Sequence, residues 1–216
     1  MSAQGNWPQF CQKLNEHQLL EMMEQIEETG FYIHKNLLDN DHVKGWQQHV
    51  NTLNSMDQFK SAKIGKKEFE STETQIRSDQ IYWLHEFTGK TRVLGDWLQN
   101  LSDELKTHFR LPIDFIESHF SIYPEGARYQ KHIDNASGQS HRLFTFIFYL
   151  NPDWQPGHGG ELVLYSPENP ERIICQIEPK GGTFVLFRSD LFYHEVLLTR
   201  VPRYTYTGWL RRNARV

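Results

Sequence analysis

Two residues, His132 and Asp134, have side chains and a spacing that suit metal binding. On an extended strand, residues two apart point to the same side, so an imidazole and a carboxylate placed in this way can reach one ion. The pair alone is weak evidence in a chain with 11 histidines, and a third ligand has to come from elsewhere. Two histidines and one carboxylate on one face of an octahedron leave positions open opposite them, which suits non-haem Fe(II).

His194 is the candidate for the third ligand, because it lies in an apolar run sixty residues after Asp134. Arg203 follows nine residues later and opens the last strand-like segment. If the two segments are antiparallel neighbours joined by a short turn, both side chains can face one cavity. The guanidinium could then hold a carboxylate with two hydrogen bonds while the histidine holds the metal. Thr205 and Thr207 share a strand face with Arg203 and could support the same carboxylate.

The elements that carry these residues differ between the two halves of the chain. Three stretches in the first half have apolar residues at helical spacing, namely 19–26, 43–53 and 93–109. We expect Gly30 to end the first helix, Asp39 or Asp41 to cap the second, and Pro112 to prevent continuation of the third. The polar segment 61–79, with charges of both signs, is predicted to be exposed and mobile.

After residue 112, short apolar runs alternate with turn residues, which is typical of β-structure. The runs are 120–123, 143–150, 161–165, 172–177, 183–187, 194–198 and 203–210. Residues 157–160 are interpreted as a hairpin turn, because a strand rather than a helix follows them. We therefore predict an α+β fold, with a double-stranded β-helix (a cupin-like jelly roll) and the N-terminal helices packed on one sheet. Residues 1–110 would form the helical support and 111–216 the core of the same compact unit.

The composition is that of an ordinary globular protein, with 38% hydrophobic and 23% charged residues. The net charge of −4 does not favour binding to nucleic acid, which normally requires a basic face. The two cysteines, Cys11 and Cys175, form no metal-binding or disulfide pattern. The first ten residues contain no apolar leader, and no apolar run is long enough to span a membrane. We expect a cytoplasmic monomer that binds no membrane.

Several blocks occur together in an order that resembles one family. They are IRSDQIYW (76–83), YPEG (123–126), YQKHIDN (129–135), FYLNPDW (148–154), GGEL (159–162), IEPK (177–180), SD before HEV (189–196) and RYTYTGW (203–209). Together they resemble the 2-oxoglutarate- and Fe(II)-dependent dioxygenases. Within these, the blocks are most similar to the prolyl 4-hydroxylases of the prolyl hydroxylase-domain (EGL-Nine-like) group, as a bacterial-type member.

The resemblance implies roles for particular residues. The implied iron ligands are His132, Asp134 and His194, and the implied 2-oxoglutarate residues are Arg203, Tyr149 and Thr207. Residues implied to lie near the substrate or the metal are Tyr123, Tyr129, Trp209, Arg142 at the entrance, and Arg77 and Asp79 as a charged pair on a closing loop. By residue type alone, Tyr149 fits the hydrophobic core equally well. The other histidines of the second half, His119, His141 and His158, have no partner at ligand spacing and are expected to be structural.

The implied activity is hydroxylation of a prolyl residue at C4 in a cytosolic protein, with Fe(2+), 2-oxoglutarate and O₂, and with ascorbate as reductant. Succinate and CO₂ would be the co-products. Three alternatives stay open. One is a hydroxylase of a free amino acid or another small molecule, and another is a nucleic-acid demethylase, which the net charge disfavours. The third is a non-catalytic cupin-like metal-binding module, which the presence of Arg203 disfavours. The identity of the protein substrate stays open as well.

Overall fold

The computed structural model describes residues 14–62, 77–136 and 141–213. The helices are α1 (Glu16–Thr29), α2 (Asn40–Ser55), η1 (Gly89–Thr91, a 3₁₀ turn) and α3 (Arg92–Phe109). The strands are β1 (Phe31–His34), β2 (Lys60–Ser61), β3 (Gln80–Leu84), β4 (Phe115–Tyr123), β5 (Tyr129–His132), β6 (Arg142–Tyr149), β7 (Leu162–Tyr165), β8 (Ile173–Ile177), β9 (Phe184–Arg188), β10 (His194–Val196) and β11 (Arg203–Arg211).

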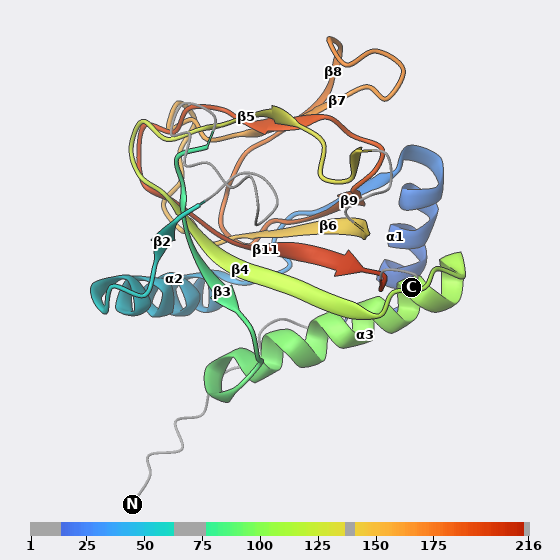
Figure 1. Ribbon diagram of the computed structural model, residues 1–216, viewed down its shortest axis with the longest axis horizontal. Helices are drawn as coiled ribbons and strands as arrows, with labels where there is room; N and C mark the ends of the chain where they lie inside the picture. The colour runs from blue at the N-terminus through green and yellow to red at the C-terminus, as the bar shows by residue number, and fades with distance from the viewer. Residues whose placement is uncertain (1–13, 63–76, 137–140, 214–216) are drawn as a thin grey trace, which may run out of the picture.

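The strands form two antiparallel sheets that lie in separate layers (Figure 1). The larger sheet has seven strands in the order β1-β9-β6-β11-β4-β3-β2, and the smaller has four in the order β5-β10-β7-β8. Side chains from both sheets meet in one buried cluster, which includes Tyr149 and Val185 from the larger sheet and Leu162 and Val196 from the smaller. An alternation of side chains between the two faces of each strand sends every second residue into this space.

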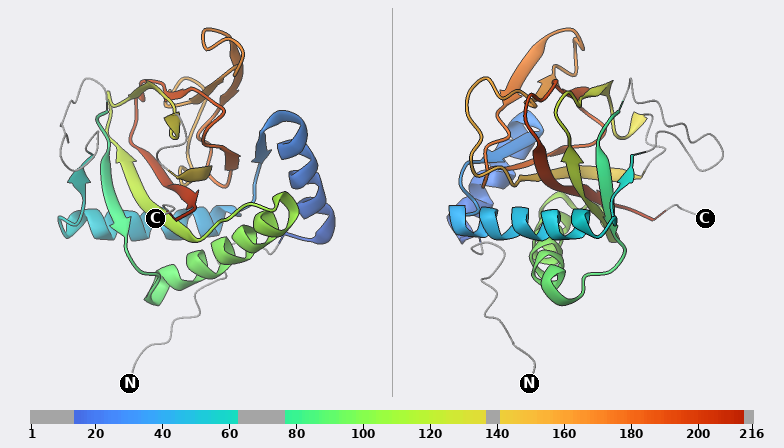
Figure 2. Two further views of the ribbon diagram at one scale, coloured as in Figure 1. Left: turned by 45° about the vertical axis from the view of Figure 1, so that its right-hand side comes forward. Right: turned by 90° about the vertical axis from the view of Figure 1, so that its left-hand side faces the viewer.

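The helices cover the other face of the larger sheet, as Figures 1 and 2 show. Their apolar stripes join a second buried cluster, in which Ile26, Trp46 and Leu98 pack with strand residues such as Phe120 and Phe148. The predicted packing of helices on one sheet is therefore observed, in a mixed helix and sheet fold with antiparallel sheets.

The helix ends follow local rules that the sequence largely reveals. Asn15 and Gln18 form a capping box at the start of α1, and Gly30 ends that helix in a left-handed conformation, with φ of 82°. Asp39, and not Asp41, caps α2 by accepting a hydrogen bond from the backbone of His42. The predicted ends of these helices are therefore confirmed, with the choice between the two aspartates resolved.

The first half of the chain is not purely helical, which corrects our description of residues 1–110 as a helical support. The strands β1, β2 and β3 precede residue 110 and occupy the two edges of the larger sheet. A boundary at 110/111 would therefore cut through one hydrogen-bonded sheet. Of the segment 61–79, residues 63–76 lie outside the described residues, so its predicted mobility stays a prediction. Within the described ranges, no helix combines the length and the apolar character needed to span a membrane.

Candidate metal and co-substrate site

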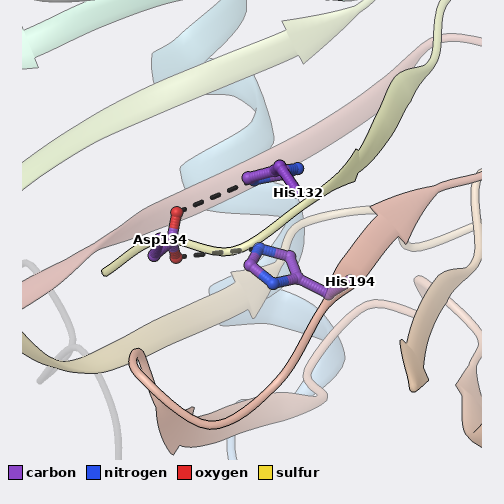
Figure 3. A group of neighbouring side chains, drawn as sticks. All are labelled: His132, Asp134 and His194. Carbon is purple, nitrogen blue, oxygen red and sulfur yellow. Dashed lines mark ion pairs between the residues drawn. The ribbon is translucent and has the colours of Figure 1, made fainter. Parts of the chain in front are cut away.

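The side chains of His132, Asp134 and His194 converge at one point between the sheets (Figure 3). One ligand atom from each lies within 4.8 Å of the others. The Nε2 atoms of His132 and His194 lie 3.7 Å and 3.6 Å from the two carboxylate oxygens of Asp134. The pairing of β5 with β10 sets His132 directly opposite His194. We expected both His132 and Asp134 to lie on one strand. The strand β5 ends at His132, however, and Asp134 lies in the turn that follows it.

Hydrogen bonds to neighbouring groups hold these three side chains in place. The Nδ1 atoms of His132 and His194 contact the backbone oxygens of Gln130 and Phe192, at 2.8 Å and 3.1 Å. A carbonyl oxygen only accepts, so each ring carries its proton on Nδ1 and presents Nε2 to the shared point. Partners of this kind fix the tautomer and the direction of a metal-binding imidazole.

Asp134 is oriented by two donors on the larger sheet. The hydroxyl of Thr145 and the indole N–H of Trp209 both donate to its Oδ2 atom, at 2.7 Å and 2.9 Å. Its Oδ1 atom faces His132 and lies 3.7 Å from the guanidinium of Arg142. Donors from the larger sheet thus hold the carboxylate while its two oxygens face the two histidines.

The protonation states of His132 and Asp134 match those of metal ligands. Burial, together with the neighbouring His194, lowers the pKa of His132 to about 3. Burial alone would raise the pKa of Asp134, but His194, His132 and Arg142 lower it overall, below its usual range. The imidazole of His132 is thus neutral and the carboxylate ionised near neutral pH, which are the forms that bind metal ions.

A pocket extends from these ligands between the sheets, and Arg203 lies in its wall. Arg203 is only 3% exposed, and its Nε atom donates to the backbone oxygen of Gly160 at 2.8 Å. Its guanidinium carbon lies 4.8 Å and 5.1 Å from the ring centres of Tyr123 and Tyr149. Burial raises the pKa of Tyr149 to about 12 although the charge of Arg203 opposes this rise, so Tyr149 is a neutral hydroxyl.

Most of the residues predicted for the site do line this pocket. They are Arg77, Tyr123, Tyr129, His132, Asp134, His194, Arg203, Thr207 and Trp209. The other three, Tyr149, Arg142 and Asp79, each contact a residue of this wall. Thr205, which shares a strand face with Arg203, lines the pocket as expected.

Charges and aromatic rings hold the side chains that were predicted to lie at the entrance and on the closing loop. The guanidinium of Arg142 lies 3.4 Å from the ring centre of Trp209 and also 3.5 Å from the carboxylate of Glu117. Arg77 makes two hydrogen bonds, of 2.6 Å and 2.9 Å, to the carboxylate of Asp79. The side chain of Asp79 has no exposed surface, so this predicted loop pair is a buried part of the pocket wall.

Three polar residues of the pocket were not predicted from the sequence: His119, Ser121 and Thr145. His119, which we expected to be structural, is 1% exposed and lies in the pocket wall, in contact with both Trp83 and Trp209. The alternation along β4 places His119 and Ser121 on the same face as Tyr123. Counting back from Tyr123 in steps of two residues would have identified both Ser121 and His119.

The residues present fit an iron(II) ion and a small dicarboxylate. The three ligands supply two nitrogens and one oxygen from one side, which leaves room for further ligands from the pocket. At Arg203, a buried guanidinium with its Nε engaged keeps its terminal amino groups for a carboxylate. The hydroxyl of Tyr149 beside it is buried and makes no hydrogen bond within the described residues. A bound carboxylate oxygen would supply the missing partner.

Comparison with known proteins agrees with this chemistry. Residues 118–211 match the family model of the 2OG-Fe(II) oxygenase superfamily. The chain is 30% identical over 200 residues to the hypoxia-inducible factor prolyl hydroxylase of Caenorhabditis elegans, a match that covers 87% of this chain and 27% of that protein. It is 27% identical to Egl nine homolog 1 of Mus musculus, covering 74% of this chain and 41% of the relative. The chain thus spans less than half the length of these two curated relatives.

Solved structures of prolyl hydroxylases share the fold. The Pseudomonas putida prolyl-4-hydroxylase superposes with a TM-score of 0.79 at 26% identity, covering 90% of this chain and 99% of that one. A prolyl hydroxylase from Trichoplax adhaerens, solved with a peptide fragment of hypoxia-inducible factor, gives 0.76 at 27% identity, with 92% and 94% covered. Together with the ligand triad, these matches show that residues 118–211 form a 2OG-Fe(II) oxygenase domain, in a chain whose homologues and structural neighbours include prolyl hydroxylases.

Proposed function

We propose that this protein is an Fe(II)- and 2-oxoglutarate-dependent peptidyl-prolyl 4-hydroxylase. The observation that carries the proposal is one pocket with His132, Asp134 and His194 on one side and the buried cation of Arg203 in its wall. Iron(II), when bound with 2-oxoglutarate and O₂, would supply the oxidising chemistry that turns a C–H bond into C–OH, with succinate and CO₂ as co-products. The two facing sheets would then be the double-stranded β-helix expected from the sequence.

The side chains of the pocket would bind and orient the reactants. His132, Asp134 and His194 would hold the iron on one face. Arg203 would bind the C5 carboxylate of 2-oxoglutarate, with the hydroxyl of Tyr149 as a second donor. Thr207 lines the same wall, but its hydroxyl donates to the backbone oxygen of Phe146, so its help to the co-substrate would be as an acceptor or through packing.

A polypeptide substrate is supported by the entrance of the pocket. Arg77, Tyr129 and Trp209 line the pocket and Arg142 lies over Trp209, so fixed charges combine with flat aromatic surfaces on the side proposed as the entrance. Such a rim suits a prolyl ring and the peptide groups on either side of it. The Trichoplax adhaerens relative, which was solved with a peptide fragment, adds support from a protein of the same fold. We further propose a cytosolic monomer whose iron is kept reduced by ascorbate, with 61–79 closing over the peptide and the core formed by 111–216.

Turnover assays separate this proposal from its rivals. The protein would be incubated with Fe(II), 2-oxoglutarate, ascorbate and a set of proline-containing peptides, and succinate and peptide mass would be followed. A gain of about 16 mass units on proline, lost in His132→Ala and Asp134→Ala, is expected because oxygen insertion adds one oxygen atom. A gain only on free amino acids would favour the small-molecule hydroxylase, and one only on nucleic-acid methyl groups the demethylase. Metal binding without any succinate would favour the non-catalytic module.

A further inference from the structure

Two neighbouring strands form one wall of the pocket with a regular set of side chains. The strands β4 and β11 are antiparallel, and alternate residues of each face the pocket. Going along the strands from the buried arginine, the directly paired residues are Tyr123 with Arg203, Ser121 with Thr205, and His119 with Thr207. Polar groups therefore continue past the carboxylate-binding end and reach the pair formed by His119 and Thr207.

His119 is a buried polar side chain that makes no hydrogen bond within the described residues, through either ring nitrogen. Its ring centre lies 4.6 Å from that of Trp83 and 5.5 Å from that of Trp209. Packing against two neighbouring indoles accounts for a flat ring at this position, but a phenyl ring would pack as well. Buried polar groups in folded proteins are nearly always paired, because an unpaired one is costly. The hydroxyl of Ser121, next along the same face, is buried and unpaired too.

The position of His119 indicates which part of a ligand it would meet. Its neighbour Trp209 donates a hydrogen bond to Asp134, one of the three metal ligands. Arg203 lies two pairs away along the strands. A ligand with one carboxylate at Arg203 and its other end at the metal would present that second end near His119. Burial, reinforced by the charges of Arg77 and Arg142, lowers the pKa of His119, so the ring is neutral and has one N–H to donate.

We infer that His119 is a positioning residue for the co-substrate, and that its ring N–H donates a hydrogen bond to an oxygen at the C1–C2 end of bound 2-oxoglutarate. The inference rests on the proposed function, because it takes the C5 carboxylate to be at Arg203. In this arrangement His119 holds the C1–C2 end of 2-oxoglutarate, and Arg203 holds its C5 carboxylate. Two anchors would fix the direction in which the co-substrate approaches the metal.

Binding of 2-oxoglutarate to the zinc-loaded protein, followed by calorimetry, tests the inference without turnover. Replacing His119 by Phe keeps a flat ring against the two indoles and removes the donor. A lost hydrogen bond to a charged oxygen predicts binding weaker by roughly 10- to 100-fold. His119→Gln, which keeps an N–H donor, should recover most of the affinity. The matched control is His49→Phe, because His49 also packs on two aromatic rings, Trp46 and Phe120, but among residues of the helix-side cluster.

A second measurement observes His119 itself in the unsubstituted protein. The ring nitrogens of His119 would be observed by ¹⁵N NMR in zinc-loaded protein, with the signal assigned from its absence in His119→Phe. Addition of 2-oxoglutarate should shift the ring N–H resonance to a hydrogen-bonded position. An unchanged resonance, or unchanged affinity in a folded His119→Phe variant, would overturn the inference. So would a loss confined to binding of a proline peptide.

Arg203→Ala separates failure of this inference from failure of the proposed function. If Arg203→Ala weakens 2-oxoglutarate binding and His119→Phe does not, only the role of His119 is refuted. If neither variant changes the affinity, 2-oxoglutarate is not held in this pocket as proposed, and both ideas fall.

Discussion

The buried ion pair between Arg77 and Asp79 offers a stringent test of the pocket wall. Arg77→Met would keep much of the apolar stem and remove the guanidinium. The carboxylate of Asp79, whose side chain has no exposed surface, would lose both hydrogen bonds from that group. Removing one partner of a buried pair costs about 3–5 kcal/mol, because the charge that stays has no compensation. At roughly 2–4 °C per kcal/mol for a chain of this size, the melting temperature should fall by roughly 6–20 °C.

A double-mutant cycle isolates the pair from the packing of its side chains. Asp79→Leu alone should cost less than Arg77→Met, because the side chain of Arg77 is 12% exposed and its charge can turn toward water. The double variant Arg77→Met/Asp79→Leu leaves no unpaired charge, so it should be more stable than Arg77→Met. Urea unfolding of the metal-free proteins would measure all four corners. Additive effects, within about 0.5 kcal/mol, would refute the idea that the two charges are coupled in the folded state.

The same variants address function, because Arg77 lies in the pocket wall and its guanidinium carbon is 4.7 Å from the ring centre of Tyr129. If the pair shapes the peptide entrance, the double variant should lose peptide hydroxylation much more than peptide-independent decarboxylation of 2-oxoglutarate. The control is Lys131→Met, which removes a similar cation that pairs with Glu171 on a neighbouring surface. Equal losses of both activities would show that the pair acts on the metal centre instead.

Four further results are expected. Arg203→Ala should raise the Kd for 2-oxoglutarate at least tenfold in calorimetry, because a charged hydrogen bond is lost, while zinc affinity stays unchanged; weaker zinc binding would contradict the assignment. Trp209→Phe removes the N–H donor to Asp134 and should weaken metal binding by roughly 10- to 100-fold in a chelator competition. Unchanged metal affinity would show that the carboxylate of Asp134 is held in place without the indole. Gly208→Ala should destabilise the fold by about 3 kcal/mol in urea, because its Cβ would lie 2.2 Å from a backbone oxygen of the neighbouring strand. His119 is neutral in the folded protein because burial lowers its pKa, so its contribution to stability is complete above the unfolded pKa of about 6.5 and is lost as pH falls below it. The metal-free His119→Phe variant should therefore lose less stability than the unsubstituted protein between about pH 6.5 and 5. The difference should be up to roughly 1.4 kcal/mol per pH unit.

Local rules explain why the helices could be predicted and some strands could not. Apolar residues at helical spacing, with Gly30 and Asp39 at the ends, specify α1 and α2 without reference to the rest of the chain. The strand β1 has only four residues between two helices, and its partner β9 lies about 150 residues further along. The residues 31–34 do not reveal that pairing, because it depends on where the distant strand β9 lies in the fold.

A similar limit applies to the site. His132, Asp134 and Arg203 could be predicted as site residues because only a few residue types bind a metal ion or a carboxylate. Thr145 is different, because a threonine in an apolar run has many possible roles. It lies beside Trp209, the other donor to Asp134, because β6 pairs with β11 in the larger sheet. The residues that support the ligands therefore follow from strand order, which the sequence of any one strand does not contain.

Strand register is the physical condition on which the whole site depends. His132 and His194 face each other because β5 and β10 pair in one register, and Leu164 of β7 lies on the other side of His194. Side chains alternate between the faces of a strand, so a slip of one residue in β10 would turn His194 out of the pocket and Glu195 into it. Apolar burial opposes such a slip, because Val196 shares the inward face of His194 and belongs to the cluster between the sheets. The metal site is thus held in register by hydrophobic packing next to it, and not only by the metal that it would bind.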